Sequence, residues 1–147
     1  MWCLRGAVPP CGRCAPAREF AWLPGIVVLA SAVSCGAPAD SAASNAARAF
    51  HESVTRADGL TACAALSARA RSELEQSAGK PCPAAVLEES QPPLSEPIEA
   101  RVYGTPAQVG SARETVFLSR FGEGWKVTAA GCTLEPTGVY DCLTQGG

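Results

Sequence analysis

The stretch TVFLSRFGEGWKVTAAG, residues Thr115–Gly131, carries the clearest β-hairpin signal of the chain. Two runs rich in β-branched and aromatic residues flank Gly122-Glu123-Gly124, a glycine-rich connection typical of a reversal between antiparallel strands. We therefore predict strands over Thr115–Phe121 and Trp125–Gly131. Alternation along the second strand predicts two faces, with Trp125, Val127 and Ala129 on one and Lys126, Thr128 and Ala130 on the other.

A second segment with a period of two residues precedes this hairpin. Ile98, Ala100 and Val102 alternate with polar or aromatic residues, which predicts a half-buried strand. Gly104-Thr105-Pro106 follows as a turn, and Ala107–Gly110 is a candidate for a short further strand. After the hairpin we expect only a loop from Cys132 to Cys142 and an irregular tail.

The N-terminal half has the period of helices instead. Apolar residues recur at helical spacing from about Ser41–Ala43, where the first helix is expected to begin. Asp58 and Ser67 are expected N-caps of the next two helices, Gly79 ends the third, and Ala84–Glu89 forms a last short one. The fold class is therefore α+β, with N-terminal helices packed on an antiparallel sheet.

The beginning of the chain is typical of an export signal. Three arginines precede an apolar run from Phe20 to Val33, and small residues follow it. The run is too short to span a bilayer, which takes about 20 apolar residues. We expect residues 1–34 to be a signal peptide that is removed.

Ala32-Val33-Ser34-Cys35 resembles the bacterial lipobox, in which a cysteine is acylated and becomes the new N-terminus. Leucine is usual where Ala32 stands. The alternative is ordinary cleavage after Ala32 or Ala39, which would make the protein secreted. The lipobox implies a lipid anchor at Cys35, a tether over residues 35–44 and a location on the outer face of the bacterial cytoplasmic membrane.

The charge of the chain argues against nucleic acid as a partner. The whole sequence has twelve Lys and Arg and fourteen Asp and Glu, of which three arginines and Glu19 precede Cys35. Nine basic and thirteen acidic residues remain, a net charge of −4 without a basic stripe. Membrane attachment would therefore rest on acyl chains rather than on basic residues.

Cysteine usage also agrees with export. After the leader and Cys35 are set aside, four cysteines remain, an even number that suits an oxidising compartment. They allow three pairings, and we expect the one between sequence neighbours: Cys63 with Cys82, and Cys132 with Cys142. Their wide spacing disfavours zinc, and we predict no metal and no cofactor.

Helices followed by a meander that ends in Phe121-Gly-Glu-Gly-Trp125-Lys-Val127 resemble the NTF2-like cone fold. The frame Ala62-Cys63-Ala-Ala-Leu66-Ser67, Gly79-Lys80-Pro81-Cys82 and Trp125-Lys-Val-Thr-Ala-Ala-Gly-Cys132 resembles a group of small actinobacterial lipoproteins. This resemblance implies a curved antiparallel sheet around the helices over residues 45–147. It does not imply any biochemical activity.

Few residues point to chemistry. His51, the only histidine, is expected on the first helix without a partner, and the strands offer no conspicuous buried carboxylate. The exposed acidic residues of the helices and the serines match no catalytic motif. If a ligand binds, we expect it at an aromatic wall inside the cone, formed by Tyr103, Phe117, Phe121 and Trp125.

Three functions remain open at this point. We expect a membrane-anchored lipoprotein that binds a small ligand or a protein. The alternative is an assembly module that forms a homodimer through an exposed apolar sheet face. An isomerase-like enzyme is less favoured, because it would require a polar cavity that contains His51.

Overall fold

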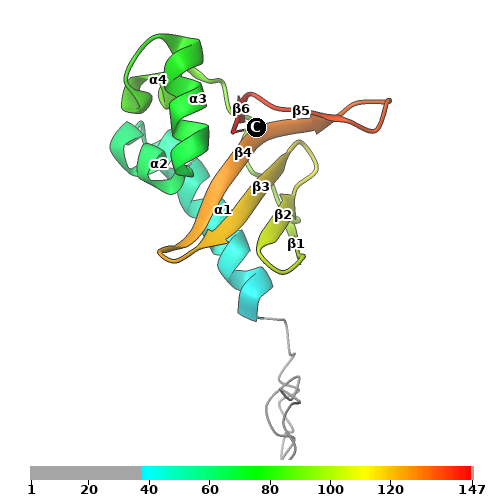
Figure 1. Cartoon of the computed structure of the whole chain (residues 1–147). Coiled ribbons are helices and arrows are strands. Elements are labelled where there is room, and N and C mark those ends of the chain that lie inside the picture. The colour runs from blue at the N-terminus through cyan, green and yellow to red at the C-terminus, as the bar shows by residue number, and fades with distance from the viewer. Residues whose placement is uncertain (1–37, 147) are drawn as a thin grey trace, which may run out of the picture. The chain divides into compact units, whose positions relative to one another are not determined.

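The computed structural model describes residues 38–146. The predicted signal peptide, the predicted lipidation site Cys35 and the first residues of the tether lie outside the described residues. The described part is α+β, as predicted: four helices pack against an open antiparallel sheet of six strands (Figure 1).

The helices are α1 (Pro38–Thr55), α2 (Gly59–Ala65), α3 (Ala68–Ala78) and α4 (Cys82–Glu88). Their ends confirm the predicted caps. Asp58 accepts a hydrogen bond from the Thr61 backbone N–H at 3.1 Å, and Ser67 Oγ accepts one from the Ala70 N–H at 3.2 Å. Gly79 ends α3 in the left-handed conformation, with φ of 64°, which glycine adopts without strain.

The start of α1 differs from the prediction. The helix begins at Pro38 rather than at Ser41–Ala43, so residues 38–44, predicted as tether, form its first turns. Proline suits the first turn of a helix, and the alanines and serines that follow are compatible with it. Only two residues, Gly36 and Ala37, lie between Cys35 and Pro38 along the chain.

The strands are β1 (Glu99–Val102), β2 (Pro106–Gly110), β3 (Thr115–Phe121), β4 (Gly124–Leu134), β5 (Tyr140–Asp141) and β6 (Thr144–Gln145). Neighbouring strands run in the order β1-β2-β3-β4-β5, all antiparallel, and β6 pairs with β4. The β3–β4 hairpin confirms the strongest prediction from the sequence.

The predicted faces of β4 are only half correct. The register between β3 and β4 shifts twice, once between Thr115 and Phe117 and once between Phe117 and Leu118. An extra residue in one strand turns the following side chains to the opposite face. Val127 is buried as expected, but beyond the shift Ala130 is buried and not Ala129.

The C-terminal part is more ordered than predicted. β5 and β6 replace the expected loop and irregular tail, and they pair with successive parts of the same edge of β4. Leu66 forms a parallel bridge to Val127 further along that edge. Strands of two residues have no detectable periodicity, so they could not be predicted from the residue pattern.

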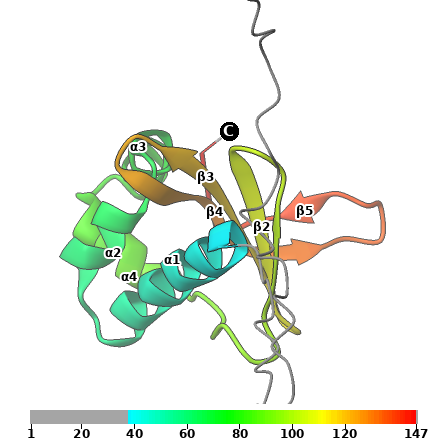
Figure 2. The same ribbon diagram turned by 90° about the horizontal axis from the view of Figure 1, so that it is seen from below.

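The core lies between the helices and one face of the sheet. α1 runs along the sheet, and the three shorter helices gather beside it (Figure 2). Side chains from all four helices and four strands meet there. Its largest fully buried apolar members are Phe50, Leu66, Val86, Val109, Val116, Leu118 and Val127.

Two cysteine pairs lie at disulfide distance, and they are the pairs expected from the sequence. Cys63 faces Cys82 with their Cα atoms 6.0 Å apart, and Cys132 faces Cys142 with theirs 4.0 Å apart. The first pair links α2 to the start of α4, and the second closes the β4–β5 hairpin. Within residues 38–146, no helix combines the length and the apolarity that a membrane span requires.

Candidate functional site

His51 and Glu114 form a buried pair that the sequence did not predict. His51 Nε2 lies 2.6 Å from Glu114 Oε1, and the two side chains are 8% and 0% exposed. Neither of these two atoms has a well-directed hydrogen bond to another group within the described residues. The expectation that His51 has no partner is therefore wrong, because chain folding brings α1 against the β2–β3 turn. The buried carboxylate comes from this turn, whereas the prediction considered only the strands.

The β2–β3 turn holds Glu114 in place through its own hydrogen bonds. The Ser111 backbone N–H donates to the Glu114 carbonyl at 2.8 Å, and Ser111 Oγ accepts from the Glu114 N–H at 3.3 Å. The carboxylate itself accepts a bond through Oε2 from the Gly131 N–H of β4 at 3.1 Å. Both carboxylate oxygens thus face polar groups, as a buried acid requires.

Gly131 allows this arrangement because it lacks a side chain. Its φ is 65°, and a Cβ atom there would lie 2.8 Å from both Gln91 Oε1 and Leu143 Cδ1. Gln91 in turn donates through Nε2 to Thr144 Oγ1 at 3.0 Å, while its Oε1 is buried without a partner. β4, β6 and the segment after α4 therefore meet at one buried polar junction.

α1 positions the histidine. His51 follows Phe50, whose ring is fully buried and lies edge-on to the imidazole, with ring centroids 5.3 Å apart. Packing of α1 on the sheet thereby fixes the orientation of the imidazole ring. One side of that ring contacts Glu114 and another lines a surface hollow.

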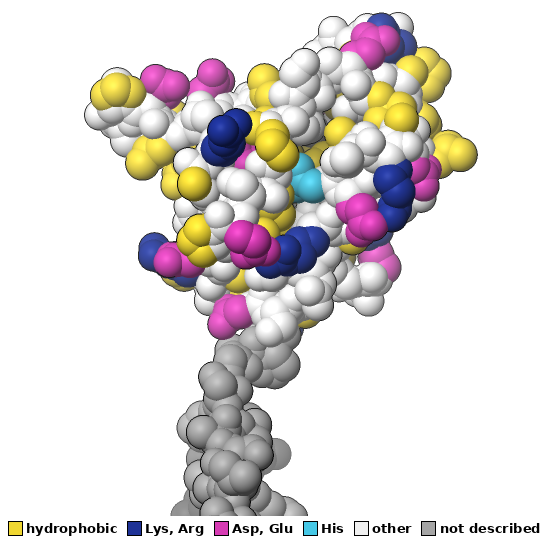
Figure 3. Space-filling view, turned by 180° about the vertical axis from the view of Figure 1, so that it is seen from behind, with side chains coloured by type: hydrophobic (Ala, Val, Ile, Leu, Met, Phe, Trp, Pro, Cys, Tyr) yellow, Lys and Arg dark blue, Asp and Glu magenta, His cyan; other side chains and the backbone are white. Residues whose placement is uncertain are grey.

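The hollow has a volume of about 330 Å³. Arg48, His51, Glu52 and Thr55 line it from α1, and Pro93 and Leu94 line it from the segment after α4. Figure 3 shows the histidine, in cyan, at its base among hydrophobic, basic and acidic side chains. The hollow therefore joins an apolar wall to polar groups, a combination typical of small-ligand sites.

Arg48 and Glu52, the arginine and glutamate that line the hollow, each have a partner of opposite charge. Arg48 Nη2 lies 2.5 Å from Glu96 Oε1 and Glu52 contacts Arg56, while Glu114, which does not itself line the hollow, faces His51. The first two pairs are exposed, and such pairs contribute little to stability. The third is buried, so removing either partner carries a large desolvation cost.

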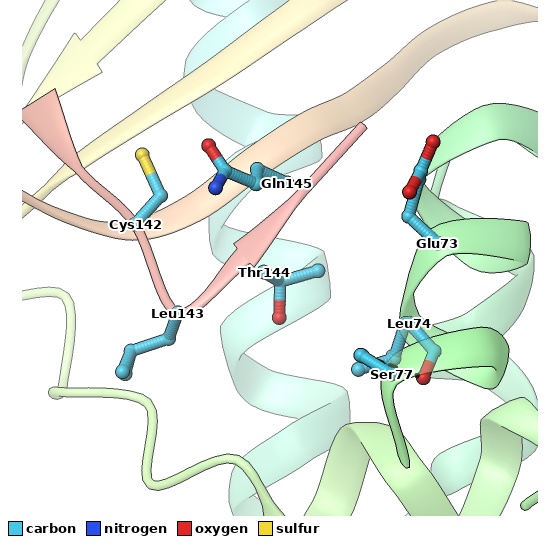
Figure 4. A pocket seen from close by; sticks show the side chains of 7 residues that line it. All are labelled: Glu73, Leu74, Ser77, Cys142, Leu143, Thr144 and Gln145. Carbon is cyan, nitrogen blue, oxygen red and sulfur yellow. Dashed lines mark hydrogen bonds between the residues drawn. The ribbon is translucent and has the colours of Figure 1, made fainter. Parts of the chain in front are cut away.

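A second hollow, of about 220 Å³, lies between α3 and the C-terminal strand. Figure 4 shows its lining: Glu73, Leu74 and Ser77 come from α3, and Cys142, Leu143, Thr144 and Gln145 face them from the C-terminal segment. Its only ionisable lining group is Glu73, which is about half exposed. It therefore lacks the buried acid–base pair of the first hollow.

The four aromatic residues predicted to form a wall do not come together at the His51 hollow. Trp125 packs on the core side, with the Arg120 guanidinium 5.9 Å from its ring centre. Phe117 lies edge-on to Tyr140, with ring centroids 5.0 Å apart. Tyr103 and Phe121 are 60% and 46% exposed at the ends of β1 and β3.

The remaining candidates keep structural roles. Glu75 Oε1 accepts a hydrogen bond from the Cys82 N–H, and Glu88 pairs with Lys80 on the surface. Ser53 Oγ donates to the Ala49 carbonyl within α1. Over residues 38–146, no three His, Cys, Asp or Glu side chains converge as they would around a metal ion.

Protein-family models, curated proteins and solved structures were each compared with the chain, and none of them matches it. The candidate site is therefore interpreted from its own geometry. The sequence held one weak signal for it, which was a single histidine on a predicted helix. Nothing in the residues around Glu114 indicated that this acid, among thirteen after residue 35, would be the buried one.

Proposed function

We propose that the mature chain is an exported lipoprotein, acylated at Cys35, whose NTF2-like domain binds a small ligand in the hollow at His51. The observation that carries the binding role is the buried His51–Glu114 pair at the base of this hollow. The lipobox-like sequence supports the anchor, and the helical layer against an antiparallel sheet supports the NTF2-like fold.

The lining favours an uncharged ligand with one hydrogen-bonding group. A ligand with a net charge would have to displace the partner of Arg48 or of Glu52, because each of these side chains already contacts one of opposite charge. His51 Nε2 is already in contact with Glu114. Pro93 and Leu94 offer apolar contact on the opposite wall. The imidazole offers a polar atom at the base, which can fix the orientation of a bound hydroxyl or carbonyl compound.

Ligand binding can be tested by filling the hollow. A panel of small alcohols, ketones, sugars and carboxylates is screened for compounds that raise the melting temperature of the purified domain. Thr55→Trp places a large side chain in the hollow from an exposed position, and Ser72→Trp adds the same bulk on α3 as a control. We expect hits with the wild type and Ser72→Trp that are lost with Thr55→Trp. Equal responses from all three proteins would contradict binding at this site.

The anchor is tested separately by the intact mass of the protein from the membrane fraction. We expect the mass of residues 35–147 plus its acyl chains. An unacylated chain that starts at Val33 or Asp40 would reject the lipid anchor and leave a secreted protein, without affecting the hollow.

A second candidate function is acid–base catalysis, and the same pair favours it. A histidine held by a buried carboxylate can accept a proton from a bound substrate and return it. A compound that binds and has an acidic C–H bond would then exchange this hydrogen for deuterium in D2O. We expect exchange with the wild type and none with His51→Gln. Binding without exchange would leave the binding role alone.

Assembly through the sheet is less well supported than binding. The face of the sheet away from the helices mixes aromatic with charged and amide groups, since Glu99, Arg101 and Gln108 line a small depression there. A dimer interface of this fold class would need a more continuous apolar surface.

A further inference from the structure

Two turns of the sheet lie at the same end of the domain as the start of α1. The β1–β2 turn and the β3–β4 turn both lie at the end of the domain where α1 starts (Figures 1 and 2). The direction of α1 agrees with this, because His51, in its second half, reaches Glu114 in the β2–β3 turn at the opposite end. A backbone bond from the Arg120 N–H to the Thr105 carbonyl, 2.9 Å long, ties the strands beside the two turns together.

The two turns present exposed aromatic rings. Tyr103 follows β1 and Phe121 ends β3, and both are among the most exposed large apolar side chains of the described residues. Trp125 is the second residue of β4 and is half-buried under Arg120. Aromatic side chains are favoured at the level of lipid headgroups, where a ring can be partly buried while its polar edge stays in water.

Chain length places a lipid anchor close to this end. Cys35 precedes Pro38 by three residues, which span about 10 Å at most in any conformation. If Cys35 carries acyl chains, the first turn of α1 cannot lie further than this from the membrane surface. The turns that share its end of the domain are then within reach of the lipid.

We infer that the β1–β2 and β3–β4 turns form a membrane-contact surface, with Tyr103 and Phe121 inserted between phospholipid headgroups beside the acylated Cys35. This inference rests on the proposed anchor. The contact is made by rings rather than by charge, because Asp40 and Glu123 at this end nearly balance Arg101, Arg120 and Lys126, and Lys126 is already bound to the Ala64 carbonyl. Neutral phosphatidylcholine is therefore sufficient for it.

With these two turns at the membrane, the opposite end of the domain points away from it. The β4–β5 hairpin, which extends from the body of the domain at the other end of the sheet, stays in water (Figure 1). Its exposed Leu134 and Val139 provide a matched control, because they resemble the turn residues in exposure but lie away from α1's first turn.

Trp125 allows a direct test, since it is the only tryptophan after residue 34. The acylated protein is placed in phosphatidylcholine vesicles, with or without bromine on the upper acyl chain. We expect bromine to quench Trp125 fluorescence, and Tyr103→Ser combined with Phe121→Ser to lose most of that quenching. Leu134→Ser combined with Val139→Ser should keep it. A reporter moved to the hairpin, Trp125→Phe combined with Thr137→Trp, should not be quenched.

The outcomes separate this inference from the anchor on which it rests. Acylated protein on vesicles that shows no quenching of Trp125, or equal quenching of the hairpin reporter, overturns the contact surface and leaves the anchor intact. A mature protein without acyl chains overturns both. Far-UV circular dichroism of each variant shows whether the fold is kept. If the double variant does not fold, the quenching experiment is done with Tyr103→Ser alone.

Discussion

The segment from α2 to α4 and the junction around Gly131 are stabilised in opposite ways. In the helical segment, polar contacts join close neighbours: Asp58 caps Thr61, Ser67 caps Ala70, and Glu75 binds Cys82 seven residues later. At the junction they join distant parts of the chain, such as Gln91 to Thr144 over 53 positions and Glu114 to Gly131 over 17.

This difference shows where the candidate site gets its rigidity. Of the local contacts only the Ser67 cap is buried; the Asp58 cap is exposed and the Glu75 contact is part-buried, so water replaces these two at little cost when they break. At the junction the Glu114–Gly131 bond is buried and the Gln91–Thr144 bond is part-buried, and a buried group that loses its partner there stays without one. We therefore expect substitutions of the same chemical kind to cost much more free energy of unfolding at the junction than in the helical segment.

The largest difference is expected between two glutamates. Glu114→Ala leaves buried His51 and the Gly131 N–H without a partner, so the free energy of unfolding should fall by about 3–5 kcal/mol. Glu75→Ala removes one part-exposed hydrogen bond and should cost about 1 kcal/mol. Urea denaturation at neutral pH measures both. Glu114→Gln, which keeps an acceptor for Gly131, should fall between them, and equal losses for both alanine variants would refute the comparison.

Each region should also depend on its own cysteine pair. Replacing Cys63 and Cys82 together by alanine reopens a loop of 19 residues and should cost about 3 kcal/mol. Replacing Cys132 and Cys142 reopens a loop of 10 residues and should cost slightly less. The same denaturation measurement applies. Peptide mapping without reduction checks the pairing, and a Cys63–Cys132 link would overturn it.

A smaller effect should separate two glycines with similar backbones. Gly131→Ala combines the strain of a left-handed residue with overlap against Gln91 and Leu143, for about 2–3 kcal/mol. Gly138, with φ of 82°, has open space around it, so Gly138→Ala should cost only the strain, about 1 kcal/mol. Thermal unfolding ranks the two variants. Similar losses would mean that the junction is not closely packed around Gly131.

The smallest effect is expected at the α2 cap. Hydrogen bonds from the Thr61 side chain, and next from its backbone N–H, lower the pKa of the exposed Asp58 carboxyl below its ordinary value of 3.8. A lowered pKa stabilises the fold above pH 3.8, and this contribution is lost as the pH falls through the folded-state pKa.

Asp58→Asn keeps an acceptor at the cap but has no titrating carboxylate. The difference in unfolding midpoint between the wild type and Asp58→Asn should be constant at neutral pH and shrink below pH 3.8. Denaturation at several pH values measures this difference. A difference that grows in acid would show that the sign is wrong.

Much of the fold could be read from neighbouring residues. The caps at Asp58 and Ser67, the end of α3 at Gly79 and the β3–β4 hairpin each depend on a few adjacent side chains and were predicted. The faces of β4 beyond Val127 were not, because the register shifts depend on how β3 pairs with it. β5 and β6 are too short to leave a periodic pattern.

The sequence by itself determined the order of helices and strands, the even set of cysteines and an N-terminus typical of export. These follow from local conformational preferences and from the hydrophobic pattern, which act along the chain. Only the tertiary structure decided that His51 meets Glu114, that the predicted aromatic wall is divided between core and surface, and that two turns share an end with the first residues of α1. The physical reason is that burial of a polar pair depends on which distant segments pack together, and no local pattern encodes that choice.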